Sequence, residues 1–167
     1  FDQVLPRAGR YRNYNITKKE WVLKGDTVYY ATSGTIAETL RYDFAQEREF
    51  SYVGLTPTDV AHHIARFISG IWQIHPFGEG NTRTTAVFAI KYLRTLGFDV
   101  NNEPFKARSW YFRNALVRAN YEDVVRGIAP TMEYLEQFFE NLLCGTSYGL
   151  RNRYLHLDWP QHVEGVQ

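Results

Sequence analysis

The sequence predicts an all-α fold, a helix bundle with one small β-hairpin attached to it. Three observations predict this fold: the length of 167 residues suits one domain, 44% of the residues are hydrophobic, and apolar residues recur at helical spacing along much of the chain. Aromatic residues make up 16% and add bulk for a core, which excludes a disordered chain. We expect residues 1–167 to form a single domain.

The first 36 residues are expected to contain an irregular arm and then the hairpin. Residues 1–20 are polar and aromatic, and we interpret their cations as a solvated basic arm, with phosphate contact as the alternative. These cations are Arg7, Arg10, Arg12, Lys18 and Lys19. Residues 27–36 are rich in β-forming residues and contain the turn signal Ser33-Gly34, which predicts a short hairpin lying on a larger body.

Helical periodicity begins at residue 36 and continues to residue 143. Ile36, Leu40 and Phe44 form the first stripe, and Thr56-Pro57-Thr58-Asp59 is a helix start with an N-cap and an acid in the first turn. The expected helices begin at residue 36 and then span residues 57–72, 80–97, 109–121 and 131–143. Residues 151–167 are expected to be a tail with one more short helix.

Composition excludes several classes of protein. The 19 Lys and Arg residues almost balance the 18 Asp and Glu residues, and a net charge of +1 argues against a nucleic-acid partner. Cys144 is the single cysteine, which excludes a disulfide framework and a thiolate zinc cluster. No apolar run approaches the ~20 residues of a membrane span, so no membrane partner is expected. The chain begins with Phe1 and has neither an initiator methionine nor a signal peptide, so we expect that it has been trimmed.

The segment His75-Pro76-Phe77-Gly78-Glu79-Gly80-Asn81-Thr82-Arg83 joins two expected helices and carries a concentration of reactive groups. Gly78 and Gly80 permit tight backbone angles, and the free N–H groups at the start of the second helix make an anion site. The segment also supplies a base, a ligand for a hard cation, an amide and a permanent cation, which are His75, Glu79, Asn81 and Arg83. These groups suit a nucleotide phosphate chain with Mg²⁺ and an imidazole that deprotonates an attacking hydroxyl.

Each of these residues also has an ordinary structural interpretation. A histidine before a proline commonly ends a helix, an Asn–Arg pair is commonly a cap and a solvated charge, and a glycine loop without a phosphate-binding lysine is a weak signal. Phe77 is expected to anchor the loop in the core. The grouping of the polar residues at one helix start favours the functional interpretation.

The segment resembles the signature of the Fic (filamentation induced by cyclic AMP) domain, His-x-Phe-x-Asp/Glu-Gly-Asn-Gly-Arg with a further arginine three residues on. Residues 25–30 are similar to the hairpin of that family, called the flap, and residues 109–121 to the helix that borders its base pocket. The resemblance covers most of residues 20–155. It implies a Fic-type helix bundle with the flap beside an active-site loop at residues 75–83.

The resemblance implies a protein adenylyltransferase, which moves AMP from ATP to a Ser, Thr or Tyr hydroxyl of a target protein and releases pyrophosphate. His75 would be the general base, for which an unperturbed imidazole pKa near ~6.5 is suitable, and Glu79 would hold Mg²⁺. Asn81 would cradle the α-phosphate and Arg83 would neutralise the β-phosphate side. The residues expected at the nucleotide are Phe77, Gly78, Gly80, Asn81, Thr82 and Arg83, together with Tyr111 and Asn120 near the adenine.

The flap would bind the target. Its strand, made of Thr27, Val28, Tyr29, Tyr30, Ala31 and Thr32, would pair with an extended segment of the target and align its hydroxyl with His75, and an ordinary edge hairpin is the alternative. The target is either another protein or the chain itself. The resemblance implies a bacterial cytoplasmic protein, or one that acts in a host cell if it is a secreted effector.

Two positions depart from the family pattern. Thr82 replaces the usual glycine, and Ala86 replaces the second arginine, which in relatives pairs with an inhibitory glutamate in a Ser/Thr-x-x-x-Glu-Gly/Asn motif. The nearest such segment here, Glu164-Gly165, has Pro160 at the Ser/Thr position, so we expect a separate inhibitory partner or another form of regulation. Two alternative functions remain: transfer of another phosphate-containing group or removal of AMP, and a catalytically silent module that binds nucleotide or peptide.

Overall fold

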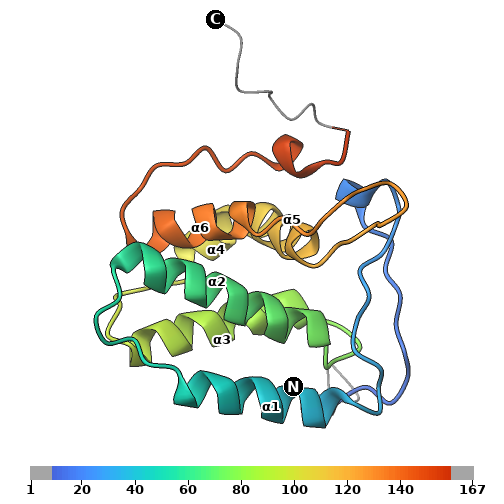
Figure 1. Cartoon of the computed structure of the whole chain (residues 1–167), viewed down its shortest axis with the longest axis horizontal. Coiled ribbons are helices and arrows are strands. Elements are labelled where there is room, and N and C mark those ends of the chain that lie inside the picture. The colour runs from blue at the N-terminus through green and yellow to red at the C-terminus, as the bar shows by residue number, and fades with distance from the viewer. Residues whose placement is uncertain (1–8, 159–167) are drawn as a thin grey trace, which may run out of the picture.

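The helical prediction is confirmed in the computed structural model, which describes residues 9–158. The described part of the chain forms a helix bundle with short 3-10 turns at its two ends (Figure 1). The elements are η1 (Trp21–Leu23), α1 (Ile36–Glu49), α2 (Pro57–Ile74), α3 (Asn81–Thr95), α4 (Glu103–Ala107), α5 (Ser109–Ala119), α6 (Glu133–Leu143) and η2 (Asn152–Leu155). The predicted residues 1–8 of the arm and 159–167 of the tail lie outside the described residues, as does Glu164-Gly165.

Helix α2 runs through the middle of the bundle and packs against α1, α3, α5 and α6. It starts as the sequence predicts: Oγ1 of Thr56 accepts a hydrogen bond from the backbone N–H of Asp59 at 3.1 Å, and the Asp59 carboxylate accepts one from the N–H of Thr56 at 3.1 Å. Ile64 and Ile68 on its apolar face are fully buried. The central position of α2 fixes where its last turn, which leads into His75, lies in the molecule.

All five predicted helices are present, with bounds that differ from the prediction by a few residues, and η2 lies where one short helix was expected in residues 151–167. Helix α1 begins at Ile36 as expected, and α3 begins at Asn81 and ends two residues before Gly97, which has a φ of 91°. Helices α5 and α6 are each two residues shorter than predicted. The sequence analysis missed α4, a five-residue helix with Pro104 in its first turn, which carries Phe105 into the core.

The predicted hairpin at 27–36 is absent, since no strand occurs between residues 9 and 158. Residues 33–35 form a turn in which the N–H of Thr35 donates to the carbonyl of Thr32 at 3.1 Å, and α1 follows at once. Ile36 is 1% exposed because it packs in the small core between α1 and α2. The burial of this helical stripe outweighs the β-propensity of the residues before it.

Residues 26–32 are extended, and they lie beside the N-terminal arm instead of a returning strand (Figure 1). The N–H of Ser33 donates to the Asn15 side chain at 2.9 Å, the N–H of Lys18 donates to Oγ1 of Thr27 at 3.3 Å, and the N–H of Glu20 donates to the carbonyl of Asp26 at 2.8 Å. Both segments cover the end of the bundle at which α2 ends and α3 begins. The arm is therefore part of the surroundings of the 75–83 loop.

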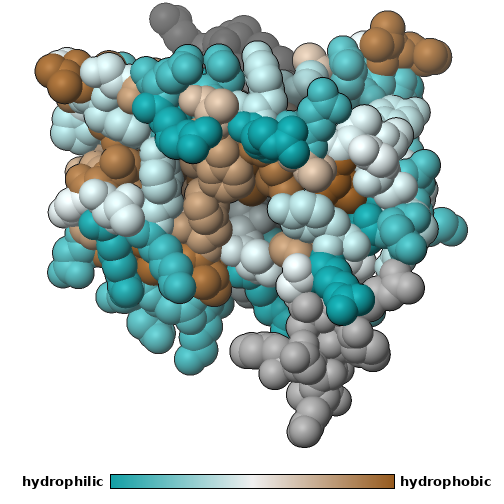
Figure 2. All heavy atoms as spheres, turned by 90° about the horizontal axis from the view of Figure 1, so that it is seen from below, coloured by the Kyte–Doolittle hydropathy of each residue, from teal (hydrophilic) through white to brown (hydrophobic). Residues whose placement is uncertain are grey.

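Helix α1 forms one long side of the bundle (Figure 1). Figure 2 views the molecule from this side and shows hydrophilic side chains with apolar surface in the gaps between them. Among the described residues, no helix is both long and apolar enough to cross a membrane.

Candidate active site

The 75–83 loop begins with a residue in an uncommon backbone conformation. His75 is the C-cap of α2 and has a φ of 51°, the left-handed region that residues other than glycine seldom adopt. Its N–H donates to the carbonyl of Trp72 at 3.0 Å, which closes the last turn of the helix. Gly80, with a φ of 75°, then directs the chain into α3. The sequence thus places the imidazole at the end of one helix and the free N–H groups of the next helix within a few residues.

Asn81 fixes the shape of the loop. Its Oδ1 accepts from the N–H of Phe77 at 2.9 Å and its Nδ2 donates to the carbonyl of Phe77 at 2.7 Å, and the side chain is 3% exposed. Phe77 lies against Tyr11 with ring centroids 6.1 Å apart and lines a cavity of about 190 Å³ between α1 and α3. Phe77 is only partly buried and lines neither the hydrophobic core nor the cavity at His75, so its expected roles as core anchor and nucleotide contact stay predictions.

Gly78 allows a side chain of the arm to approach the loop. A Cβ atom at this position would lie 2.6 Å from the hydroxyl of Tyr14. Cβ atoms in proteins do not approach other atoms this closely, so this position requires glycine or a movement of Tyr14.

Arg12 holds the end of α2 from the arm. Its guanidinium donates to the carbonyls of His75 at 2.8 Å, Ile74 at 3.2 Å and Tyr14 at 2.7 Å, and also to the carbonyl of Ala31. Arg12 is 3% exposed, so the interpretation of it as a solvated cation is wrong. A buried cation at the C-terminal end of a helix interacts favourably with the helix dipole. Arg12 therefore joins the arm, the extended segment and the histidine into one unit.

The His75 ring has a defined tautomer. Nδ1 lies 3.0 Å from the carbonyl oxygen of Trp72, which can only accept, so Nδ1 carries the proton and Nε2 keeps a free lone pair. The ring is 4.2 Å from the Tyr30 ring and 5.0 Å from the Trp72 ring. Burial, then the nearby Lys18, and then Arg12 and Arg113 lower the pKa of His75 to about 3. The sequence alone suggests an unperturbed value, and the structure instead keeps this imidazole neutral throughout the physiological range.

His75 faces a small polar cavity of about 200 Å³. The cavity is lined by Lys18, Glu20, Trp72, His75, Gly80, Asn81, Thr82, Arg83 and Arg113. The resemblance had pointed to His75, Gly80, Asn81, Thr82 and Arg83, and the structure brings these five together. The sequence analysis assigned no site role to Glu20 or Arg113 and gave Lys18 phosphate contact only as an alternative.

Glu20 and Arg113 form an ion pair at the wall of this cavity, with Oε2 of Glu20 2.7 Å from the Arg113 guanidinium. Glu20 is fully buried, and burial raises the pKa of its carboxyl. Its Oε1 accepts from the hydroxyl of Tyr30 at 3.3 Å. Packing of η1 against α5 brings the two elements together. No periodicity specifies the path of the arm, so sequence alone carried no signal for this pair.

Thr82 has a structural role that a glycine could not fill. Its Oγ1 accepts a hydrogen bond from the indole N–H of Trp72 at 3.0 Å, and Trp72 is 1% exposed. The bond satisfies a buried donor and joins the start of α3 to the last turn of α2.

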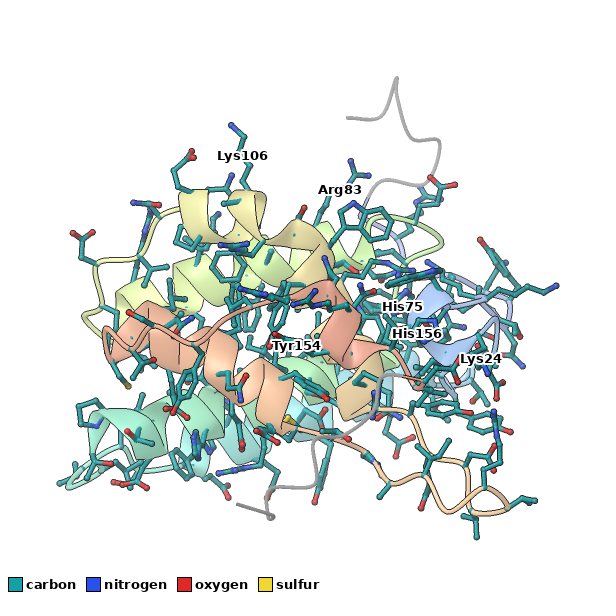
Figure 3. All side chains as sticks on the ribbon, turned by 90° about the horizontal axis from the view of Figure 1, so that it is seen from above. Lys24, His75, Arg83, Lys106, Tyr154 and His156 are labelled. Carbon is teal, nitrogen blue, oxygen red and sulfur yellow. The ribbon has the colours of Figure 1, made fainter. Side chains whose placement is uncertain are left out.

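The two charged residues of the loop differ from His75 in exposure. Glu79 is exposed and lies close enough to Lys18 to act on its pKa, and Arg83 is exposed at the rim of the cavity. Figure 3 shows Arg83 extending outward from α3 and His75 lying inside the molecule. Residues 9–158 contain no group of three or more histidine, cysteine or acidic side chains that could hold a metal ion. Glu79 is not among the residues that line the cavity, and its expected role as a Mg²⁺ ligand stays a prediction.

Tyr111 and Asn120 do not line this cavity. The hydroxyl of Tyr111 donates to the carbonyl of Tyr134 at 3.1 Å, and the ring is 2% exposed in the core. Nδ2 of Asn120 donates to Oγ of Ser69 at 2.8 Å and to the carbonyl of Leu116 at 2.8 Å. Both residues join helices, and their assignment to the adenine stays a prediction.

The residues expected to bind a target are dispersed. Val28 is buried in the core, Tyr30 covers His75, and Tyr29 is 81% exposed with its carbonyl accepting from the Gln73 side chain at 3.2 Å. The others in the segment are Thr27, Ala31 and Thr32, of which the first and last are tied by hydrogen bonds to the arm and to Thr35. Among these six residues, Tyr29 and Thr32 are exposed.

Comparison of the sequence with models of known protein families gave a match that includes the 75–83 loop. A profile of the Fic/DOC family matches residues 1–93, more than half of the 167 residues. The chain therefore belongs to the Fic/DOC family, which supports a Fic-type transferase. The comparisons with curated proteins and with solved structures found no match.

Proposed function

We propose that this protein is a Mg²⁺-dependent adenylyltransferase, which transfers AMP from ATP to a hydroxyl of a target protein. The observation that carries the proposal is the environment of His75, whose Nδ1 is bonded to a carbonyl and which lines a cavity together with the start of α3 and with cations. Free helix N–H groups and fixed cations are suited to phosphate oxygens. A neutral imidazole is suited to accept the proton of a hydroxyl.

In this proposal the target hydroxyl gives its proton to Nε2 of His75 while its oxygen attacks the α-phosphorus of ATP. The bond from the α-phosphorus to the oxygen that joins it to the β-phosphate breaks, and pyrophosphate leaves with that oxygen. The target retains AMP as a phosphodiester, and His75 returns the proton to solvent. The protein contributes positioning and charge neutralisation, which suffice for this chemistry.

Glu79 would hold Mg²⁺, which would neutralise charge on the phosphates and help to orient them. The N–H groups at the start of α3 would bind oxygens of the α-phosphate, and Arg83 would interact with the oxygens beyond it. A target segment would lie beside residues 27–32, where Tyr29 offers an exposed ring.

Burial is the largest cause of the low pKa of His75, and a pKa of about 3 makes this imidazole a weak base at neutral pH. Part of the lowering comes from Lys18, Arg12 and Arg113, and a bound triphosphate would offset those charges. We therefore expect the pKa of His75 to rise when nucleotide binds, which makes the imidazole a stronger base at the moment it is needed.

The test uses ATP labelled on either the α- or the γ-phosphate, with Mg²⁺, the protein and a bacterial lysate as the source of targets. We expect α-labelled ATP to give label on protein that is lost with His75→Asn, and γ-labelled ATP to give none that depends on His75. Asparagine is chosen because it tolerates the positive φ of this position. His156→Asn is the matched control and should keep the activity, because His156 lies beside Trp21 and is not among the residues that line the cavity. Label from γ-labelled ATP that is lost with His75→Asn would indicate phosphate transfer instead, and the absence of any label that depends on His75 would favour a binding module.

A further inference from the structure

We propose that Arg113 and Lys18, which line the cavity together with Arg83, bind the distal phosphates of the nucleotide. The inference rests on the proposed function and adds two specific residues to it. It assigns the cavity a polyphosphate as its ligand and makes the N-terminal arm a part of the substrate site.

The charge balance of the cavity favours a polyanion. Its wall carries three cations, Lys18, Arg83 and Arg113, against one acid, Glu20. Glu20 is paired with Arg113, and Glu79 lies close enough to Lys18 to act on its pKa, so the three cations still exceed these two acids by one charge. A volume of about 200 Å³ is small for a whole nucleotide, and it suits a phosphate chain with the nucleoside outside.

Arg113 is held in place but retains donors for a ligand. Its ion pair with the fully buried Glu20 fixes the guanidinium, and its side chain is still 29% exposed at the cavity. A guanidinium has five N–H donors, of which one carboxylate uses at most two. Trp110 lies beneath the group, with the guanidinium carbon 5.8 Å from the ring centroid. Such a fixed fork is suited to phosphate oxygens.

The surroundings of Lys18 indicate that the cations are close together. Burial and then the charge of Arg113 lower the pKa of Lys18, while Glu20 and Glu79 act in the opposite direction. Two cations held near each other repel, and a phosphate chain between them would relieve that repulsion. The same cations lower the pKa of His75, so the three groups share one electrostatic environment.

Helix α3 itself offers little charge for the distal phosphates. After Arg83 its next residues are Thr84, Thr85 and Ala86, and Ala86 packs against the core. Arg113 comes from α5 and Lys18 from the arm, so the cations reach the cavity from three separate segments. The arm would then contribute to ligand affinity as well as to the support of His75.

The test is calorimetric titration of the protein with tripolyphosphate, pyrophosphate and orthophosphate, which need no nucleoside and no turnover. The main variant is Glu20→Gln with Arg113→Gln, because it keeps the net charge and avoids leaving a buried carboxylate unpaired. Lys18→Gln is an independent variant that leaves this pair intact. Lys106→Gln is the matched control, because Lys106 is exposed on α4 and points away from the bundle (Figure 3).

We expect tripolyphosphate to bind more tightly than orthophosphate. The double variant should weaken tripolyphosphate binding by about 10- to 100-fold, the loss typical of a charged hydrogen bond, and Lys18→Gln by several-fold. Lys106→Gln should change it by less than about twofold. Melting temperatures show whether each variant is folded. If the double variant is not folded, tripolyphosphate binding by Lys18→Gln tests the inference alone.

Absence of tripolyphosphate binding to the wild type, or binding that neither variant weakens, would overturn the inference. The AMP-transfer assay separates this outcome from failure of the proposed function. Polyphosphate binding through Arg113 without any AMP transfer would support the inference and contradict the proposed function. AMP transfer by the wild type, with polyphosphate binding that the variants do not weaken, would support the proposed function and contradict the inference.

Discussion

Replacing Thr82 with valine removes one hydroxyl and little else, which makes it a sharp test of how the loop is built. The substitution keeps the branched shape and the helix propensity of the residue but deprives the Trp72 indole of its acceptor at 3.0 Å. Trp72 is 1% exposed, so its N–H would be left buried without a partner. The cost of an unsatisfied buried donor is about 1–3 kcal/mol. Thr82 itself is partly exposed, which lets water replace part of the bond and favours the lower half of that range.

Urea denaturation and thermal melting measure this effect directly. For a chain of this size, about 1–2 kcal/mol corresponds to a fall in Tm of roughly 2–8 °C. Thr82→Ser is the matched control, because it keeps the hydroxyl and should lose less stability than the valine variant.

A double-mutant cycle assigns the loss to one contact. In a Trp72→Phe background there is no indole N–H, so Thr82→Val should cost close to nothing, and the coupling energy should be about 1 kcal/mol or more. An equal loss of stability in both backgrounds would refute the role given to this hydrogen bond.

Three further predictions concern the loop and its supports. Arg12→Lys should lower the free energy of unfolding by about 2–4 kcal/mol in urea titration, because a lysine cannot reach the separate carbonyls that the guanidinium binds, and an unchanged value would contradict this account. Below pH 6.5 His75 is protonated in the unfolded chain, whereas in the folded chain it stays neutral down to about pH 3. The free energy of unfolding should therefore fall on acidification, by up to about 1.4 kcal/mol per pH unit more than in His75→Asn. Urea curves at pH 7 and pH 5 measure this difference. Gly78→Ala should cost about 1 kcal/mol in thermal melts through the contact with Tyr14, and Tyr14→Phe should largely remove that cost if the hydroxyl is responsible.

The helices could be predicted from sequence because their signals are local. The capping box at Thr56 and the apolar stripe that follows it define α2, and the loop after it was identified as the site by its own residues. The sequence pattern also brought His75, Asn81, Thr82 and Arg83 together correctly, since they lie within one helical junction.

The surroundings of the loop could not be predicted, because they depend on where distant segments lie. Arg12 and Lys18 belong to an arm without periodicity, and Arg113 lies on a helix whose apolar pattern says nothing of its neighbours at η1. The hairpin prediction failed for a related reason. The segment before Ile36 is joined to the arm by hydrogen bonds between Thr27 and Lys18 and between Ser33 and Asn15. Helix α1 begins at Ile36, so no returning strand follows this segment.

The central claim is that the cavity beside His75 receives the phosphates of ATP. It is tested most directly by a crystal structure of the His75→Asn protein with ATP and Mg²⁺. Our account predicts the α-phosphate at the N–H groups that begin α3, next to the substituted side chain, with the remaining phosphates between Arg83 and Arg113. Phosphates bound elsewhere on the molecule, or an α-phosphorus beyond the reach of the residue at position 75, would contradict it.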